Sequence, residues 1–144
     1  MKSLNLVKTI VLFLIILILN LFWEFSHYRL YIDLTGIPST THLIIASLTD
    51  VFLIGFMFML MSLINKSVRW IDKPQLKDYL IIIIFSIIIS ITIELYSVSQ
   101  GRWAYTSAMP TIFGVGLSPL IQLFTTGIIG LWLLGIFDGY FSKE

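Results

Sequence analysis

Long apolar runs alternate with short polar segments along the chain, and this pattern predicts four membrane-spanning helices. The runs cover about residues 6–31, 41–64, 74–99 and 119–140. A helix needs about 20 mostly apolar residues to cross a hydrocarbon core of about 30 Å, so each run is long enough. Glycine and proline interrupt the helical periodicity between the runs. The expected fold class is therefore all-α, an integral membrane four-helix bundle forming a single transmembrane domain over residues 1–144.

Local signals support two of the predicted helix starts and the retention of the first helix. Pro119 directly follows Ser118, and Pro74 follows Asp72-Lys73. Serine and aspartate are favoured as helix N-caps, and proline is favoured at the first helical position. Lys2 and Lys8 precede the first apolar run, as in a secretory signal peptide. No small-x-small cleavage site follows this run, so we interpret it as a retained helix.

The basic residues predict the orientation of the bundle. Seven of the nine lie at the N-terminus, between the second and third helices, and at the C-terminus, against two in the other loops. The positive-inside rule places the side rich in lysine and arginine in the cytoplasm. The chain is therefore expected to be a multi-pass protein with both termini inside (N-in/C-in), and Arg29 and Arg102 are expected to lie outside.

Composition agrees with a membrane protein and excludes several function classes. Charged residues make up 12 % of the chain and apolar residues 58 %, whereas a soluble domain carries about 25 % charged residues. The net charge of +1 gives no reason to expect nucleic acid as a partner. The absence of cysteine excludes disulfides and thiolate chemistry. No phosphate-binding loop, nucleophile elbow or HExxH motif is present, and no cofactor is expected.

Three acidic residues at membrane depth are the candidate catalytic groups: Glu24, Asp50 and Glu94. An ionisable side chain at the centre of a membrane helix costs about 2.5–3.5 kcal/mol on insertion scales. With the topology above, all three lie toward the outer end, Asp50 roughly 13 Å and Glu94 roughly 9 Å deep at 1.5 Å per residue. We therefore expect them to converge on the interior of the bundle. For Glu24, a solvated place at the interface or a pairing with Arg29 stays open.

Polar side chains follow one face of each predicted helix, at helical spacing. The four faces comprise Asn20, Glu24, His27 and Tyr31; His42, Ala46 and Asp50; Ser86, Ser90, Glu94 and Ser97; and Gln122 and Thr126. Such faces also hold membrane helices together. Part of the pattern, above all the serines, is thus explained by packing alone.

The segment between the third and fourth helices is expected to cover the bundle mouth. It begins Gln-Gly-Arg-Trp-Ala-Tyr at residues 100–105 and becomes too apolar for an ordinary exposed loop. Non-helical backbone is tolerated there if protein or water covers it. We expect Arg102 to reach Glu94 or Asp50. The predicted substrate-binding residues are Arg102, Trp103, Tyr105, Gln100, Gln122, His27 and Trp23.

A metal site is the less favoured interpretation of the acidic residues. Glu24-x-x-His27 is similar to the helix motif of di-iron bundles, but such bundles need two of these motifs and two more glutamates. A single metal bound by Glu24, His27, Asp50 and Glu94 stays open as an alternative. The site is therefore predicted without a metal ion.

Several of these residues together resemble the signature of a family of small prokaryotic membrane proteins. The resemblance rests on Glu94, Gly101-Arg102-Trp103, Tyr105, Met109-Pro110, Gly114, Gly116-Leu117, Pro119 and Gln122, with Trp23-Glu24 and Asp50. It implies no activity, because this family is uncharacterised. It implies the prokaryotic cytoplasmic membrane as the location and gives these residues a joint role.

Two functions of different classes remain. The first is binding or chemical modification of a lipid or other apolar molecule that enters from the outer leaflet. A buried carboxyl can protonate an alkene or epoxide, as in intramembrane isoprenoid cyclases and isomerases, and aromatic walls suit a cationic intermediate. This is an analogy of chemistry, not of motif. The second is a proton- or ion-coupled carrier or an accessory subunit, working as a homodimer that packs through Gly135 and Gly139.

Overall fold

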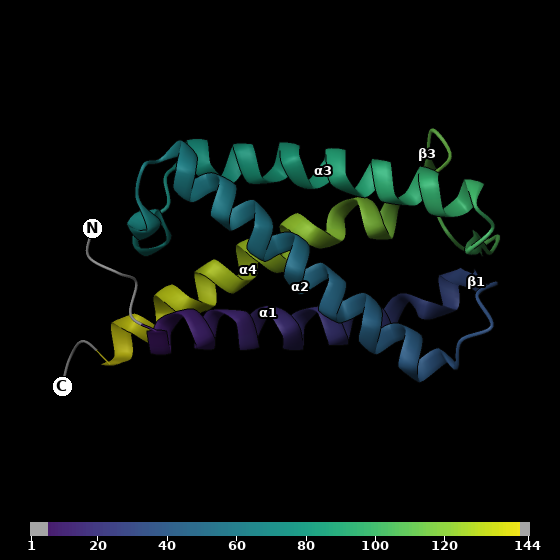
Figure 1. Cartoon of the computed structure of the whole chain (residues 1–144), viewed down its shortest axis with the longest axis horizontal. Helices are drawn as coiled ribbons and strands as arrows, with labels where there is room; N and C mark the ends of the chain where they lie inside the picture. Colours follow the sequence, from purple (N-terminus) through teal and green to yellow (C-terminus); the bar gives the residue numbers. More distant parts are fainter. Residues whose placement is uncertain (1–5, 142–144) are drawn as a thin grey trace.

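The structure, a computed structural model that describes residues 6–141, contains four long helices that run along one axis (Figure 1). They are α1 (Leu6–His27), α2 (Ser39–Ile64), α3 (Leu76–Ser99) and α4 (Leu117–Phe141). All four are long and apolar enough to cross a membrane. The predicted all-α four-helix membrane bundle is confirmed, whereas its N-in/C-in orientation stays a prediction.

The helix boundaries lie within four residues of the predicted ones, and the start of α1 and the ends of α2 and α3 coincide with them. α1 ends at His27 and continues as a 3₁₀ turn, η1 (Tyr28–Leu30), and a short strand, β1 (Tyr31–Asp33). Pro119 is the third residue of α4, and Pro74 precedes α3 by two residues instead of opening it. Both positions are compatible with proline, because the first four N–H groups of a helix have no intrahelical acceptor.

The apolar core fills the half of the bundle away from the strands. Leu12 and Ile16 of α1, Ile54 and Met57 of α2, and Ile82 of α3 are fully buried there. Many other large apolar side chains face outward, as expected for helices whose surroundings are hydrocarbon. The core extends over all four helices, so it holds the bundle together from the inside.

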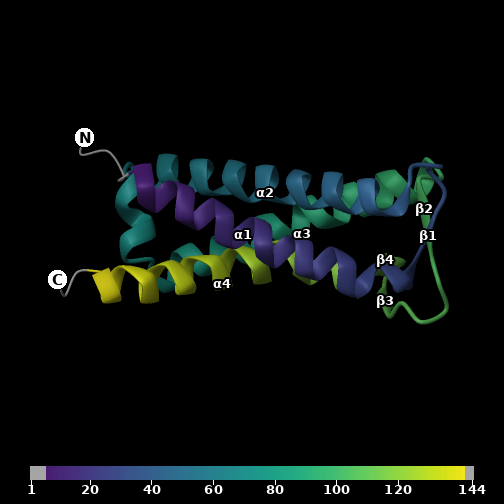
Figure 2. The same cartoon turned by 90° about the horizontal axis from the view of Figure 1, so that it is seen from below.

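Four short strands lie together at one end of the bundle, which we call the strand end (Figure 2). β1 pairs antiparallel with β2 (Trp103–Tyr105), in a register that places Tyr31 opposite Tyr105. β3 (Thr111–Ile112) and β4 (Val115–Gly116) form a hairpin. Its two-residue turn has positive φ at Phe113 (49°) and Gly114 (81°), as the tightest hairpin turns require.

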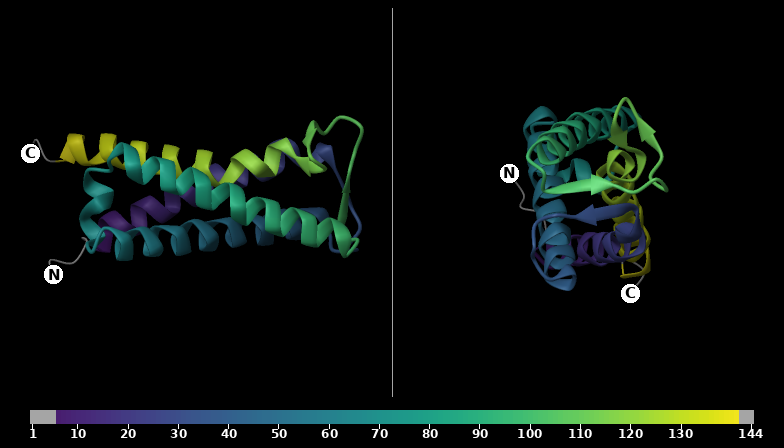
Figure 3. Two further views of the ribbon diagram at one scale, coloured as in Figure 1. Left: turned by 90° about the horizontal axis from the view of Figure 1, so that it is seen from above. Right: turned by 90° about the vertical axis from the view of Figure 1, so that its right-hand side faces the viewer.

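The β1–β2 pair joins the two connections at the strand end and crosses the end of the bundle, as the end-on view in Figure 3 shows. One strand precedes α2, and the other follows α3. Two segments far apart in the sequence are thus tied together over the helix ends. The segment after α3 covers the bundle mouth, but as one strand of a sheet and not as a free loop.

At the opposite end, the 3₁₀ helix η2 (Val68–Asp72) connects α2 to α3. Lys8 of α1 forms ion pairs with Asp72 and with Asp138 of α4, so one lysine connects three elements. Burial alone would raise the pKa of Asp72, but the hydrogen bonds from Lys8 and Arg69 hold it below its ordinary value. We call this the η2 end.

The first residues of α1 and the last residues of α4 lie at the η2 end (Figure 1). We expect alkaline phosphatase fused to the C-terminus to be inactive, because the positive-inside rule places this end in the cytoplasm, where the enzyme does not fold. The same reporter inserted between β2 and β3 should be active. The assay is phosphatase activity in whole cells at matched expression, and strong activity of the C-terminal fusion would reverse the orientation.

Candidate functional site

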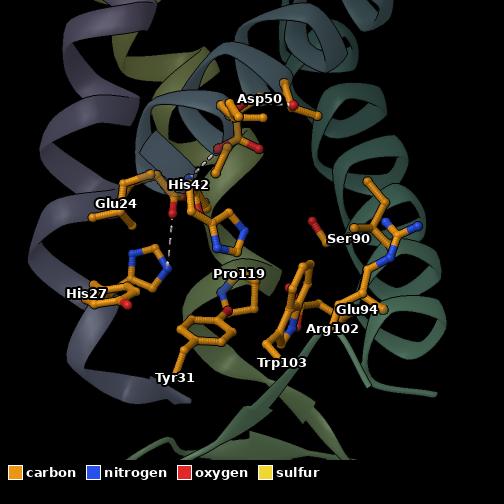
Figure 4. Close-up of a pocket in the computed structure, with 18 of the residues that line it drawn as sticks. Glu24, His27, Tyr31, His42, Asp50, Ser90, Glu94, Arg102, Trp103 and Pro119 are labelled. Carbon is orange, nitrogen blue, oxygen red and sulfur yellow. Dashed lines mark hydrogen bonds and ion pairs between the residues drawn. The ribbon is translucent and has the colours of Figure 1, made fainter. Parts of the chain in front are cut away.

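A cavity of about 270 Å³ lies between the four helices at the strand end (Figure 4). Helices α1 to α4 all contribute lining residues, and the segments around β1 and β2 contribute the rest. The polar and charged residues that line it are Glu24, His27, Asp33, His42, Thr49, Asp50, Ser90, Glu94, Ser97, Arg102 and Gln122. The three predicted acidic groups, from three different helices, therefore border one space.

Gln122 of α4 holds two of these carboxyl groups together. Its side-chain N–H₂ donates to Glu24 Oε1 and to Asp50 Oδ2, each at 2.7 Å. A longer contact of 3.3 Å joins it to Asn20 Oδ1, which Thr126 also approaches at 3.3 Å. An amide nitrogen has two hydrogens, so the two short contacts use both. One buried glutamine thus fixes a carboxyl pair from α1 and α2.

Glu94 of α3 is anchored separately, by the aromatic residues of β2. Tyr105 donates its hydroxyl hydrogen to Glu94 Oε2 at 2.6 Å, and Trp103 donates its indole N–H to the same oxygen at 3.2 Å. The side chain is 5 % exposed. Burial, together with the bond to Glu94, raises the pKa of Tyr105, so its hydroxyl stays a donor. The strand-end sheet therefore positions a carboxyl in the cavity wall.

The expected pairing of Arg102 with Glu94 or Asp50 is wrong. The Arg102 guanidinium lies over the ring of Tyr96, 5.4 Å from its centroid, and forms no ion pair with a carboxylate within residues 6–141. The physical reason is that Tyr105 and Trp103 already donate to Glu94 without the cost of burying a guanidinium. Arg102 instead remains exposed at the rim of the cavity.

Two histidines on the cavity wall are each oriented through Nδ1. His27 Nδ1 is 2.7 Å from the carbonyl oxygen of Trp23, which can only accept, so this nitrogen carries the hydrogen. His42 Nδ1 is paired with the Asp33 carboxylate. In both rings Nε2 is left to other partners, and that of His27 lies 4.0 Å from Glu24 Oε2. The cavity thus has two imidazoles in a defined orientation beside its carboxyl groups.

The pair of Asp33 and His42 also stabilises the connection between α1 and α2. Although burial acts to raise the pKa of Asp33, the hydrogen bonds from His42 and Thr35 lower it below its ordinary value. A depressed folded-state pKa means that this contribution to stability is present at neutral pH and is lost as the pH falls through that pKa.

Seven of the ten predicted site residues line the cavity: Glu24, Asp50, Glu94, His27, Arg102, Trp103 and Gln122. The other three do not. Tyr105 is not on the lining but donates a hydrogen bond to Glu94, which is. Trp23 donates to Ser118 Oγ at 3.2 Å and so joins α1 to α4. Gln100 is exposed at the end of α3. Their proposed roles in substrate binding stay predictions.

The cavity is also lined by residues that the sequence did not assign to the site: Tyr28, Tyr31, Asp33, His42, Ser90 and Ser97. Four of them, Tyr31, His42, Ser90 and Ser97, belong to the polar faces that the sequence predicted, so those faces already carried the signal. Asp33 had no such signal, because it lies on a strand that no pattern predicted.

The described residues do not support the single-metal alternative. Between residues 6 and 141, no group of three or more histidine, aspartate or glutamate side chains is arranged to hold a metal ion. Glu94 is held on α3 by β2, while Glu24 and Asp50 are held by Gln122.

Comparison of the chain with protein-family models, with curated proteins and with solved structures finds no match. The resemblance to a family of small prokaryotic membrane proteins therefore stays a prediction.

Proposed function

We propose that this protein binds an apolar or amphipathic molecule of the bilayer in the strand-end cavity, and that its carboxyl groups act on that molecule as acid and base. The cavity would receive the reactive or polar end of the molecule. Glu94 would lie on one side of it and the pair of Glu24 and Asp50 on the other. The proposal rests on the position of the cavity within membrane-spanning helices, since molecules reach such a site most readily from the bilayer.

The closed floor of the cavity carries this proposal. Leu53 and Leu123 line the cavity, and the fully buried Ile16, Ile54 and Met57 fill the bundle toward the η2 end. A carrier needs polar groups that become accessible from both sides of the membrane. The polar groups here gather at one end, which favours a one-sided binding site over a transport path.

The carboxyl groups supply the chemistry that such a site offers. Several carboxylates in one low-dielectric space repel one another, so the site favours a shared proton or a bound positive charge. A protonated carboxyl can donate to a double bond, and a second carboxylate can stabilise the cation that forms. Tyr31 and Trp103, whose ring centroids are 6.2 Å apart, also line the cavity and would stabilise the same charge.

The test is retention of a bilayer molecule during purification. We expect wild-type protein, purified in mild detergent, to release a hydrophobic molecule that native mass spectrometry detects. Asp50→Asn and Glu94→Gln should each lower its occupancy about 10-fold or more, because a hydrogen bond to a charged group contributes about 1.5–3 kcal/mol.

Asp72→Asn is the matched control, since this carboxylate lies at the η2 end, outside the cavity. It should leave the occupancy unchanged. Equal retention by all four proteins would contradict a binding site in the cavity. If the reconstituted protein moved ions across the proteoliposome membrane in a way that depends on Glu94, the carrier function would be supported in place of this proposal.

A further inference from the structure

The cavity opens sideways, between α2 and α3. The two helices approach each other at the η2 end and diverge toward the strand end (Figure 1). Ile45 and Thr49 of α2 line the cavity and are also exposed on the outer surface of the bundle, Ile45 to 49 %. Both helices are candidate membrane spans, so the surface beside Ile45 and Thr49 faces hydrocarbon. The cavity and the bilayer therefore meet at these two residues.

The geometry of α2 assigns this opening to the α3 side. Gly55 faces α1, because a Cβ built there would lie 3.0 Å from the Phe13 ring. Met57 faces α3, where its sulfur accepts a hydrogen bond from Ser86 at 3.3 Å. By helical spacing, the lining residues Ala46, Asp50 and Leu53 lie on the α3 side of α2. Thr49 and then Ile45 continue this lining from the α3 side to the outer face of the helix. Ile44, the neighbouring residue, is 43 % exposed but does not line the cavity.

Ser90 of α3 provides a polar group without a partner on the inner wall. Its side chain is 4 % exposed, and its hydroxyl has no hydrogen-bond partner among residues 6–141. It lines the cavity and points into it, one helical turn from Glu94 (Figure 4). A buried hydroxyl without a partner is unfavourable, because the hydrogen bonds it made to water are not replaced. A ligand with a polar head at this position would remove that cost.

The charges around Ser90 select the sign of such a head. Glu94, Asp50 and Glu24 border the same space. Of the basic side chains on the lining, the Arg102 guanidinium lies over Tyr96, His42 is paired with Asp33, and His27 is bonded to the Trp23 carbonyl oxygen. The rings of Tyr31 and Trp103 stand perpendicular to each other, at 85°, on the wall. Carboxylates combined with aromatic faces bind ammonium groups well. A phosphate would instead be repelled by the carboxyl groups of Glu24, Asp50 and Glu94.

The volume limits how much of a ligand fits. A cavity of about 150 Å³ holds one benzene ring, and this one measures about 270 Å³. It accommodates a head group and a few carbon atoms, but not a long chain. The remainder of a longer molecule must extend through the opening beside Ile45 and Thr49.

We propose that the cavity takes the ammonium head of a single-chain amphiphilic amine, whose hydrocarbon tail leaves between α2 and α3 into the bilayer. This inference rests on the proposed function and names its ligand class and route of access. Ser90 and Glu94 accept hydrogen bonds from the ammonium group. Asp50 and Glu24 balance its charge from the opposite wall.

The experiment compares three probes of equal chain length: dodecylamine, dodecanol and dodecyl phosphate. Binding to the full-length protein in detergent is measured as a dissociation constant at neutral pH, where the amine is protonated. We expect dodecylamine to bind at least 10-fold more tightly than either other probe. Ser90→Ala should weaken binding of the amine several-fold, and Glu94→Gln should remove most of its advantage over dodecanol.

The route is tested with a matched pair of variants. Ile45→Trp should weaken dodecylamine binding at least 10-fold by filling the opening, whereas Ile44→Trp should leave it unchanged. Size-exclusion profiles and helical circular dichroism check the fold, and Ile45→Ala, which widens the opening, should bind at least as well as wild type. Equal effects of Ile45→Trp and Ile44→Trp would refute the sideways route.

The outcomes separate this inference from the proposed function. If dodecanol or dodecyl phosphate binds as tightly as dodecylamine and Glu94→Gln weakens that binding, the cavity is a binding site but the ammonium assignment is wrong. If none of the probes binds in a way that depends on Glu94 or Asp50, both the assignment and the proposed function fail.

Discussion

Replacing Gln122 by leucine is expected to lower the free energy of unfolding by about 3–6 kcal/mol, because two hydrogen bonds to carboxyl groups, each contributing about 1.5–3 kcal/mol, are lost together. Leucine has a similar volume, so the loss comes from chemistry and not from a void. Glu24 and Asp50 would then be left close together without a common donor. The measurement is reversible unfolding in mixed micelles of a mild detergent and dodecyl sulfate.

Two further variants make this prediction specific to the carboxyl pair. Gln100→Leu is the control, since Gln100 is exposed at the end of α3, and it should change stability by less than about 0.5 kcal/mol. Adding Asp50→Asn to Gln122→Leu should recover part of the loss, because one of the two unpaired carboxyl groups is then neutral. A loss for Gln122→Leu no larger than that for Gln100→Leu would mean that the amide does not hold the pair.

The four spans and their polar faces follow from the sequence because the bilayer leaves few alternatives. A segment in hydrocarbon must satisfy its backbone internally, so long apolar runs become helices. Ionisable and hydroxyl side chains on these helices are costly where they face lipid, so they are expected in the interior of the bundle. Ser86, Ser90, Glu94 and Ser97 were expected on one face of the third helix, and all four are buried on α3. Hydrophobic pattern and helical spacing were sufficient for this part of the site.

The strand end could not be predicted, because its contacts join segments that share no local pattern. Tyr31 continues the helical spacing of Asn20, Glu24 and His27, yet the chain leaves the helix before it and enters β1. Its partner Tyr105 is far away in the sequence, on a strand of three residues. A strand of three residues is too short to show the alternation of apolar and polar residues that identifies strands in a sequence.

The same limit explains the error about Arg102. A charge complementary to Glu94, a few residues further along, made an ion pair the simplest expectation. The β1–β2 register instead brings the Trp103 and Tyr105 side chains to Glu94. Which neighbour satisfies a buried carboxyl thus depends on strand pairing, which the charges alone do not contain.

The second large effect is expected at this contact, where Tyr105→Phe should destabilise the protein by about 1.5–3 kcal/mol, the range for a hydrogen bond to a charged group. Phenylalanine keeps the ring and removes only the hydroxyl that donates to Glu94 at 2.6 Å. Tyr28→Phe is the matched control, because Tyr28 also lines the cavity but does not donate to Glu94. It should have a much smaller effect.

A double-mutant cycle shows whether Glu94 and Tyr105 act as a unit. Glu94→Gln combined with Tyr105→Phe should cost less than the sum of the single losses, by about 0.5–3 kcal/mol, because the hydroxyl of Tyr105 bonds more strongly to a carboxylate than to the amide oxygen of glutamine. Arg102→Ala should cost no more than about 1 kcal/mol, the size of an exposed cation–π contact, and should be additive with Glu94→Gln. If Glu94 were instead coupled to Arg102 and not to Tyr105, these two residues would form the ion pair expected from the sequence, and the strand-end geometry would be contradicted.

Glu94→Gln separates a structural role from an acidic one, because it keeps the shape of the side chain and removes its charge and its acid proton. A glutamine oxygen can still accept from Tyr105 and Trp103, so this variant should fold and retain its helical content. Ligand occupancy and any turnover should nevertheless fall, since neither an ammonium group nor a developing cation meets a carboxylate there. If Glu94→Gln leaves stability, ligand occupancy and every other phenotype intact, acid–base chemistry must be abandoned in favour of an accessory membrane subunit.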